Sequence, residues 1–425
     1  MQNGMAPPAY SRLRFFICLH RHLLLFLLAS GGVADRGFVG LADNQSLVLR
    51  APGEGQVLIN GADFRTLLET VEALKQRTET QARQLGELEQ QLERQRCATV
   101  ADDWTIAGVS ATSFDWVHGV LAGNGKIYGI PYNIDSVLII DPAAQTADTT
   151  TITGLTSFTP ASWSGGVLAG NGKIYIIPYH AQTVLIVDPV TNTADETSIV
   201  GLGAQPQKWV RGVLAGNGKI YGMPSDAPSV LIIDPATNTV DTTSIAGLDT
   251  QDSWTGGVLA SNGKIYGMPY QASAVLIIDP DTNKIDLTTI AGLGTQPGKW
   301  YCGVLGLNGK IYGIPHASDA VLMIDPVTNT ADTTTITGLT QACCKFKWSD
   351  GVRAPSGKIY GAPWGTSAVL VIDPATNTTD VTSITVPAGS RWYGGALARD
   401  GKIYHIPGIA TSVLIIKRNC ERLDI

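Results

Sequence analysis

The pattern of hydrophobic and polar positions repeats itself over most of this 425-residue chain. From Trp116 onward one unit recurs seven times, and its second copy reads WSGGVLAGNGKIYIIPYHAQTVLIVDPVTNTADETSIVGL. Every copy opens with a tryptophan, and successive tryptophans lie about 46 residues apart: Trp116, Trp163, Trp209, Trp254, Trp300, Trp348 and Trp392. The chain therefore contains a tandem array of one structural unit.

Each copy predicts four strands and no helix. Short runs rich in β-branched residues alternate with turns of Gly, Pro, Asn and Asp. In the second copy the strands are Gly165–Ala169, Lys173–Pro178, Thr183–Asp188 and Asp195–Ile199. A period in the forties with four strands per copy is typical of a propeller blade, because stacked neighbours bury each other's faces. We therefore predict an all-β fold, a seven-bladed β-propeller of four-stranded blades.

The seventh copy is one strand short. It ends after its third strand, Ser412–Ile416, but a segment ahead of the first copy has the missing pattern. Residues Ala101–Gly108 align with Ala147–Gly154, which contain the fourth strand of the first copy. We predict that this N-terminal strand completes the last blade and closes a propeller of residues 97–425, because closure removes exposed sheet edges.

Two cysteines flank this junction. In the same alignment Cys97 and Cys420 fall at the positions of Ala143 and Ala144, in the turn between the third and fourth strands. The chain is continuous there in six blades, whereas the seventh has two chain ends. We predict a Cys97–Cys420 disulfide that replaces the missing connection, and loop-closure entropy gives it a stabilisation of about 4–5 kcal/mol.

The repeat resembles a known family. Gly-Lys-Ile-Tyr followed by Val-Leu-Ile-Ile-Asp-Pro-x-Thr-Asn-Thr resembles the kelch repeat and the related bacterial YVTN repeat over residues 99–417. Where a kelch strand ends in a double glycine, this chain has Gly-Ile-Pro or Gly-Met-Pro, as at Gly129–Pro131. The resemblance implies a seven-bladed propeller, a fold used for binding more often than for catalysis, and no particular subfamily.

The beginning of the chain has a different pattern. Three arginines precede an apolar run, Leu23–Ala29, and the small residues Gly32 and Ala34 follow it. This order is typical of a secretory signal peptide, here residues 1–34, and predicts a protein that is secreted or on the extracellular surface. The alternative is an uncleaved membrane anchor over Phe15–Ala29, although a His-Arg-His interruption leaves it short for a bilayer.

Two further segments precede the repeats. Residues 35–62 predict a short β segment and linker, and residues 63–96 predict a coiled coil. Steps of four and three residues alternate along a seam made of Leu67, Val71, Leu74, Thr78, Gln81, Leu85, Leu88 and Leu92. We expect the coiled coil to make the protein a homo-oligomer, either a dimer or a trimer, and a single solvated helix is the alternative.

Composition and motifs narrow the function. Only 16% of the residues are charged and the net charge is −6, which argues against a nucleic-acid partner. The sequence has no phosphate-binding loop, G-x-S-x-G or H-E-x-x-H motif, so we predict no cofactor, no metal and no catalytic residue. We favour a non-catalytic binding protein; the alternatives are an inert scaffold and a propeller hydrolase, lyase or oxidoreductase with its site at the channel mouth.

The copies agree at one rim of the predicted propeller and differ at the other. A Lys opens the second strand and an Asp ends the third in most copies, as Lys126 and Asp141 do, which predicts partly exposed ion pairs of structural value. The opposite rim carries variable loops rich in aromatic residues, as a ligand or partner site requires. Drift among the copies is the alternative explanation. We predict that a protein or a glycan binds there through Tyr132, Tyr179, Tyr270, His316, Trp364, His118, Arg211 and Asp350.

Three more cysteines belong to the variable rim. Cys302 lies in the fifth copy, and Cys343 and Cys344 lie in the loop that leads into the sixth. A disulfide between Cys302 and either of the others stays open at this point, as does a vicinal Cys343–Cys344 bridge. A metal site made from His118, His316, Cys302 and Asp350 would need separate blades to converge on one ion, so we do not expect one.

Overall fold

The computed structural model describes residues 39–42, 46–49, 58–59, 62–109, 113–251, 253–340 and 346–420. These divide into two compact units, residues 1–95 and 96–425. The predicted signal peptide, residues 1–34, lies outside the described residues, and so do Cys343 and Cys344.

The described residues of the first unit form two short hairpins and one helix. Strand β1 (Val39–Ala42) pairs with β2 (Ser46–Leu49), and β3 (Leu58–Ile59) pairs with β4 (Ala62–Asp63). Helix α1 (Phe64–Arg96) has 33 residues and runs into the second unit without a linker. The apolar seam residues Val71, Leu74 and Leu85 of α1 are exposed, as are the polar ones Thr78 and Gln81. None of the described helices is long and apolar enough to cross a membrane.

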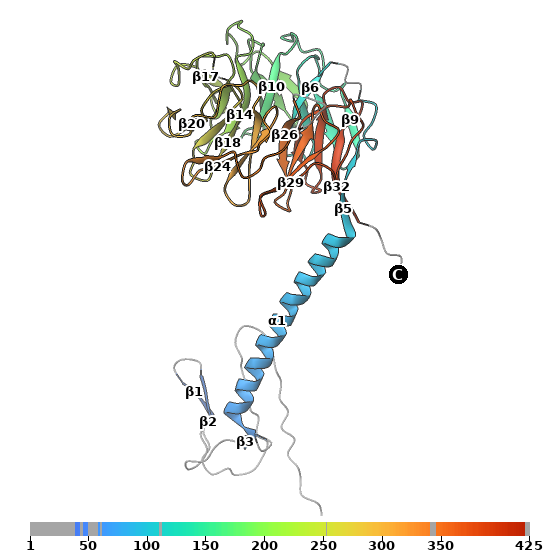
Figure 1. The fold of residues 1–425 in the computed structure, drawn as a ribbon, viewed down its shortest axis with the longest axis vertical. Helices are drawn as coiled ribbons and strands as arrows, with labels where there is room; N and C mark the ends of the chain where they lie inside the picture. Colours follow the sequence, from blue (N-terminus) through green and yellow to red (C-terminus); the bar gives the residue numbers. More distant parts are fainter. Residues whose placement is uncertain are drawn as a thin grey trace, which may run out of the picture. The chain divides into compact units, whose positions relative to one another are not determined.

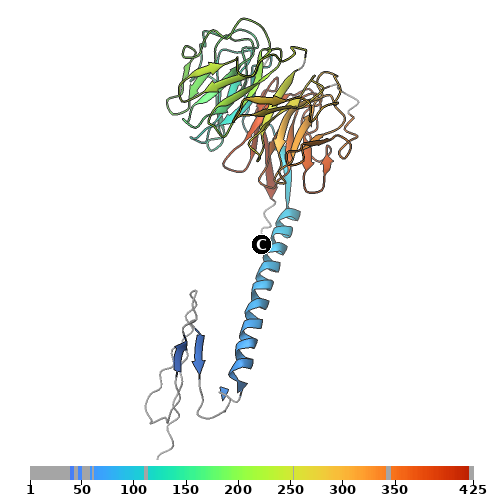
Figure 2. The same cartoon turned by 90° about the vertical axis from the view of Figure 1, so that its left-hand side faces the viewer.

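The second unit consists of seven four-stranded antiparallel sheets (Figures 1 and 2). The first strands are β6 (Trp116–Leu121), β10 (Trp163–Leu168), β14 (Trp209–Leu214), β18 (Trp254–Leu259), β22 (Trp300–Leu305), β26 (Trp348–Arg353) and β30 (Trp392–Leu397). The second strands are β7 (Ile127–Pro131), β11 (Ile174–Pro178), β15 (Ile220–Pro224), β19 (Ile265–Pro269), β23 (Ile311–Pro315), β27 (Ile359–Pro363) and β31 (Ile403–Pro407).

The outer half of each sheet follows the same order. The third strands are β8 (Leu138–Asp141), β12 (Leu185–Asp188), β16 (Leu231–Asp234), β20 (Leu276–Asp279), β24 (Leu322–Asp325), β28 (Leu370–Asp373) and β32 (Leu414–Cys420). The fourth strands are β9 (Thr146–Asp148), β13 (Thr193–Asp195), β17 (Thr239–Asp241), β21 (Lys284–Asp286), β25 (Thr330–Asp332), β29 (Thr378–Asp380) and β5 (Cys97–Asp102).

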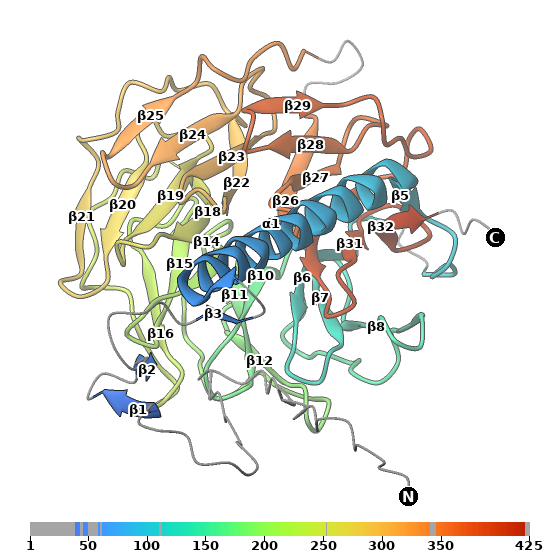
Figure 3. The same cartoon turned by 90° about the horizontal axis from the view of Figure 1, so that it is seen from below.

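The sheets are arranged radially. Figure 3 shows β18 and β22 near the middle of the ring and β21 and β25 at its edge. The first strands contact their neighbours all the way round, including β30 against β6. The predicted all-β, seven-bladed propeller of four-stranded blades is therefore confirmed.

The core lies between the blades. Ile127 and Leu138 of the first blade pack with Tyr404 and Ile406 of the seventh, and corresponding clusters fill the other junctions. The repeated tryptophans are buried wedges, and each indole N–H donates to a backbone carbonyl, as Trp116 does to Ser136 at 2.7 Å. Burying that polar group with an acceptor avoids a desolvation cost.

The seventh sheet takes its fourth strand from the other end of the repeats. Strand β5 pairs with β32 antiparallel, with Asp102 opposite Ile415 and Cys97 opposite Cys420 (Figure 1). Directly opposed residues of antiparallel strands have Cα atoms about 4.5–5.5 Å apart, which a disulfide can bridge. The side chains of Cys97 and Cys420 lie outside the described part, so the disulfide stays a prediction.

The third-to-fourth strand turns lie on one face of the ring, which we call the uniform face. The predicted ion pairs join Lys126 to Asp141 at 3.3 Å and recur in five further blades. A second-strand tyrosine also links neighbouring blades, since the hydroxyl of Tyr128 donates to Asn192 Oδ1 at 2.7 Å. Repetition of these contacts explains why the copies agree at this rim.

Candidate binding site on the variable face

The opposite face carries the second-to-third strand loops, the fourth-to-first strand loops and the start of each first strand. We call it the variable face. A β-bulge lies in the first strand of each blade, near the centre of this face. The register of the strand shifts there, around the position two residues after the opening tryptophan. His118 and Arg211 stand in two bulges with φ of 52° and 58°, a backbone conformation that costs non-glycine residues free energy. Such bulges redirect a side chain locally.

Glycine at the same position of another blade makes room for these side chains. A Cβ atom on Gly165 would lie 2.8 Å from the Cα atom of Arg211, closer than real Cβ contacts come. Gly165 is therefore required where Arg211 of the next blade fills the ring centre.

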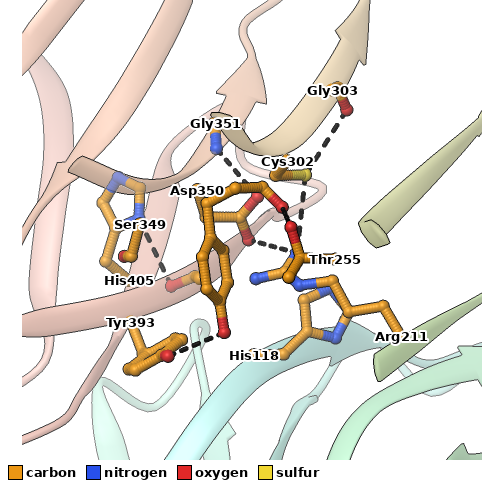
Figure 4. Close-up of polar contacts among 12 residues, drawn as sticks. His118, Arg211, Thr255, Cys302, Gly303, Ser349, Asp350, Gly351, Tyr393 and His405 are labelled. Atoms are coloured by element: carbon orange, nitrogen blue, oxygen red, sulfur yellow. Dashed lines mark hydrogen bonds and ion pairs between the residues drawn. The ribbon is translucent and has the colours of Figure 1, made fainter. Parts of the chain in front are cut away.

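An ion pair spans the ring. Arg211 of the third blade and Asp350 of the sixth meet with Nη1 and Oδ2 2.9 Å apart (Figure 4). Their side chains are 8% and 4% exposed, so the pair is buried. Burial alone would raise the pKa of Asp350, but the charge of Arg211 acts together with His118 and with hydrogen bonds from Cys302 and Arg211, and the net effect lowers it. The carboxylate is thus ionised and already paired.

His118 lies beside this pair in a neutral form. Burial and the positive charge of Arg211 lower its pKa to about 4. Its Nδ1 accepts a long hydrogen bond of 3.4 Å from the backbone N–H of Gly166. His405, fully buried nearby, also has a pKa of about 4 because of burial.

Cys302 completes the buried centre. It is a free thiol whose sulfur lies 3.5 Å from Arg211 Nη1 and donates to the carbonyl of Gly303 at 3.4 Å. Burial raises the pKa of the thiol, so it stays protonated. The disulfide that the sequence left open for Cys302 is not formed, because its sulfur faces the ion pair.

Aromatic side chains cover this centre. Tyr301 stacks near the guanidinium of Arg211, with 5.6 Å between the Arg carbon and the ring centroid. Its hydroxyl is 2.7 Å from that of Tyr393. The rings of Tyr270 and His316 lie 5.9 and 5.2 Å from the Tyr301 ring. We define the aromatic cluster as Tyr132, Tyr179, Tyr270, Tyr301, His316, Trp364 and Tyr393.

The phenol groups of the cluster face a common region. Burial raises the pKa of Tyr179, and so do the nearby phenols of Tyr132, Tyr301 and Tyr270. Burial and the same kind of neighbour raise the pKa of Tyr393. All five tyrosines remain half-buried rather than covered. The five tyrosines therefore present partly exposed side chains together on the variable face.

Trp364 forms the edge of the cluster. Its ring stacks on Phe114 at 4.7 Å and meets the ring of Tyr393 edge-on at 4.6 Å. The guanidinium of Arg391 lies 5.6 Å from the Trp364 centroid and 6.0 Å from that of Phe114. These contacts fix the indole in one position.

Buried lysines hold the loops that carry the cluster. Lys208 donates to the carbonyls of Tyr179, His180 and Ala181 at 3.4, 3.2 and 2.9 Å. Burial lowers the pKa of Lys208 to about 8. Lys299 binds the carbonyl of Ala272 at 3.0 Å, and Lys347 pairs with Asp319 at 3.1 Å. Each lysine immediately precedes an opening tryptophan, and each clamps the preceding blade's loop.

All eight predicted site residues lie on the variable face, but at two depths. Tyr132, Tyr179, Tyr270 and Trp364 belong to its half-buried surface. Arg211, Asp350 and His316 are buried, and His118 lies beside the ion pair. Tyr301, Tyr393 and the three lysines were not among the residues predicted from the sequence. The one available signal was a tyrosine directly after the opening tryptophan in just two copies.

The centre offers little for metal or acid–base chemistry. Among the described residues, no group of three His, Cys, Asp or Glu side chains is arranged to hold a metal ion. The carboxylate is paired, the thiol is protonated and the imidazoles are neutral at pH 7. The accessible chemistry is that of phenols and aromatic faces.

Comparisons with known proteins identify the architecture. No family model and no curated protein matches the sequence. A streptogramin B lyase is similar in structure at 12% identity, with a TM-score of 0.60 over 75% of this chain and 97% of that one. A catalytically inactive variant of virginiamycin B lyase from Staphylococcus aureus with quinupristin has 10% identity, a TM-score of 0.59 and coverages of 75% and 99%.

A third similar structure is an extracellular domain. The extracellular domain of a putative hybrid two component system from Bacteroides thetaiotaomicron has 11% identity and a TM-score of 0.54, covering 75% of this chain and 42% of that one. At sequence identities this low, structural similarity indicates a shared fold but not a shared function. By its structure and its neighbours, the chain has the seven-bladed β-propeller fold.

Proposed function

We propose that this protein is a non-catalytic binding module, secreted or on the extracellular surface, that recognises a protein or a glycan through the variable face. The observation that carries the proposal is the aromatic cluster, whose tyrosine and tryptophan side chains are partly exposed while the charges beneath them are paired. Rigid aromatic side chains with one polar end give large contact area at little entropic cost.

The state of the buried groups supports binding over catalysis. A general acid or base needs a pKa near the working pH, and a nucleophile needs activation. His118 has a pKa of about 4, and burial raises the pKa of Cys302. The alternative, a propeller enzyme at the channel mouth, would have to work with Asp350 held by Arg211.

The chain enters the propeller on the face opposite the aromatic cluster. Strand β5 begins at Cys97, opposite the last residue of β32, so the chain enters the propeller at the uniform face. The seam of α1, exposed at Val71, Leu74 and Leu85, would pair with further copies. Two or three faces on one oligomer would gain avidity from weak single sites.

A ligand screen tests the proposal. The full chain is applied to a glycan array and to an array of purified extracellular proteins. We expect at least one ligand, bound at least tenfold more weakly by Trp364→Ala and Tyr179→Ala. Tyr221→Phe, whose hydroxyl contacts Asn283 on the uniform face, is the matched control and should bind normally. The proposal would be contradicted if all variants bound equally well or if the bound ligand were chemically converted. It would also be contradicted if no ligand bound on either array.

The oligomer has its own test. Leu74→Asp and Leu85→Asp together should turn the assembly into monomers, because both charges enter the seam. Light scattering coupled to size-exclusion chromatography measures the mass directly. A monomeric wild type would refute the coiled coil and leave the binding face untouched.

A further inference from the structure

The geometry points to a ligand class for the aromatic cluster: we propose that it binds a neutral saccharide. The inference rests on the proposed function and deepens it. Pyranose rings present C–H faces that pack on aromatic rings and a rim of hydroxyls that both donate and accept hydrogen bonds. The cluster offers the complement, since five phenols and one indole share a region of the variable face.

The hydroxyl groups of Tyr301 and Tyr393 are placed for this role. They lie 2.7 Å apart and share one hydrogen bond, so each retains further capacity to accept or donate. An edge-on contact from Tyr270 and a tilted contact from His316 hold the Tyr301 ring in place. A preorganised pair of hydroxyls loses little entropy when a sugar hydroxyl joins it.

Charge disfavours a cationic ligand. Aromatic cages for quaternary ammonium groups need ring faces with free negative potential. Here Arg211 already lies 5.6 Å from the centroid of Tyr301, and Arg391 lies 5.6 Å from that of Trp364. A second cation would find these ring faces already taken by a guanidinium.

Charge also disfavours an anionic ligand. The exposed side chains of Asp135, Asp226 and Asp249 lie in loops of the variable face. Lys208 is buried and binds carbonyls, and Arg211 is neutralised by Asp350. A carboxylated or sulfated sugar would lose hydration without gaining a free cation at the centre of the cluster. A neutral polar ring fits both conditions.

Calorimetric titration of the full chain tests the class. The probes are neutral hexasaccharides of glucose, galactose and mannose, an oligogalacturonate, sialylated lactose and a trimethyllysine peptide. We expect one neutral series to bind, and binding to fall tenfold or more in Tyr270→Ala. The Tyr301→Phe/Tyr393→Phe double variant keeps both rings, should fold normally, and should bind three- to tenfold more weakly. Tyr221→Phe again serves as the control.

The outcomes separate this inference from the proposed function. Binding of an acidic sugar or of the trimethyllysine peptide alone would overturn the neutral class while supporting a binding face. Neutral sugar binding that both tyrosine variants leave unchanged would overturn the site. A protein ligand lost in Trp364→Ala, with no sugar bound, would overturn the saccharide and keep the proposed function.

Discussion

Replacing Arg211 with methionine would isolate the carboxylate of Asp350 in the ring centre. Asp350 is 3% exposed and would keep the Gly351 N–H, 2.8 Å from its Oδ1, but no guanidinium. Breaking a buried pair by removing one partner typically costs about 3–5 kcal/mol, because the remaining charge is desolvated and uncompensated. We expect a loss of this size in the free energy of unfolding, measured by urea denaturation at pH 7.

Two further measurements sharpen this prediction. The double variant Arg211→Met/Asp350→Leu removes both charges and should be less destabilised than Arg211→Met alone, since apolar replacements of buried pairs are often tolerated. In the single variant the pKa of Asp350 should rise, so its destabilisation should shrink as the pH falls and the carboxyl becomes neutral. A loss below about 1 kcal/mol, or a double variant as unstable as the single one, would refute the buried pair.

Three more outcomes can be checked. Non-reducing peptide mapping should find Cys97 linked to Cys420, and Cys420→Ser should cost about 2–5 kcal/mol of stability; two free thiols would contradict it. Burial lowers the pKa of His405 in the folded protein to about 4, below the unfolded value of 6.5. The contribution of the neutral imidazole to the free energy of unfolding is therefore present above pH 6.5 and is lost as the pH falls toward 4, and it amounts to about 3 kcal/mol. His405→Gln should flatten this fall in the free energy of unfolding. Lys208→Met should loosen the loop that carries Tyr179 and weaken ligand binding several-fold, with little effect on the position of Trp364. Faster hydrogen exchange of the loop amides would report the loosening. Unchanged exchange would contradict the role of Lys208 in holding the loop.

The fold was predictable because it repeats. All seven copies share the same alternation of apolar and polar residues, the same turn residues and the opening tryptophan. An ambiguous strand assignment in one copy can therefore be resolved from the other copies. The register of the last blade followed from the match of Ala101–Gly108 to the first copy, and Asp102 indeed lies opposite Ile415 as Asp148 lies opposite Ile139.

The site was predictable only in outline. Positions that break the repeat pointed to the right face, but the sequence does not say which of them meet. Arg211 and Asp350 are three blades apart and touch only because the ring is narrow and bulges turn the side chains inward. The sequence also did not indicate how deeply each site residue is buried. A residue that varies among the copies can be buried at the centre of the face or exposed at its edge.

The way the chain enters the last blade has a mechanical consequence. If a ligand holds the variable face and tension reaches the propeller at Cys97, the force acts along β5 and slides it against β32. Six residue pairs, from Asp102 with Ile415 to Cys97 with Cys420, would then resist together in shear rather than open one after another. A bond between the two cysteines would sit where the load enters and pass it to the third strand before any backbone hydrogen bond is strained. Under such a load, the strand that closes the ring would also carry the tension.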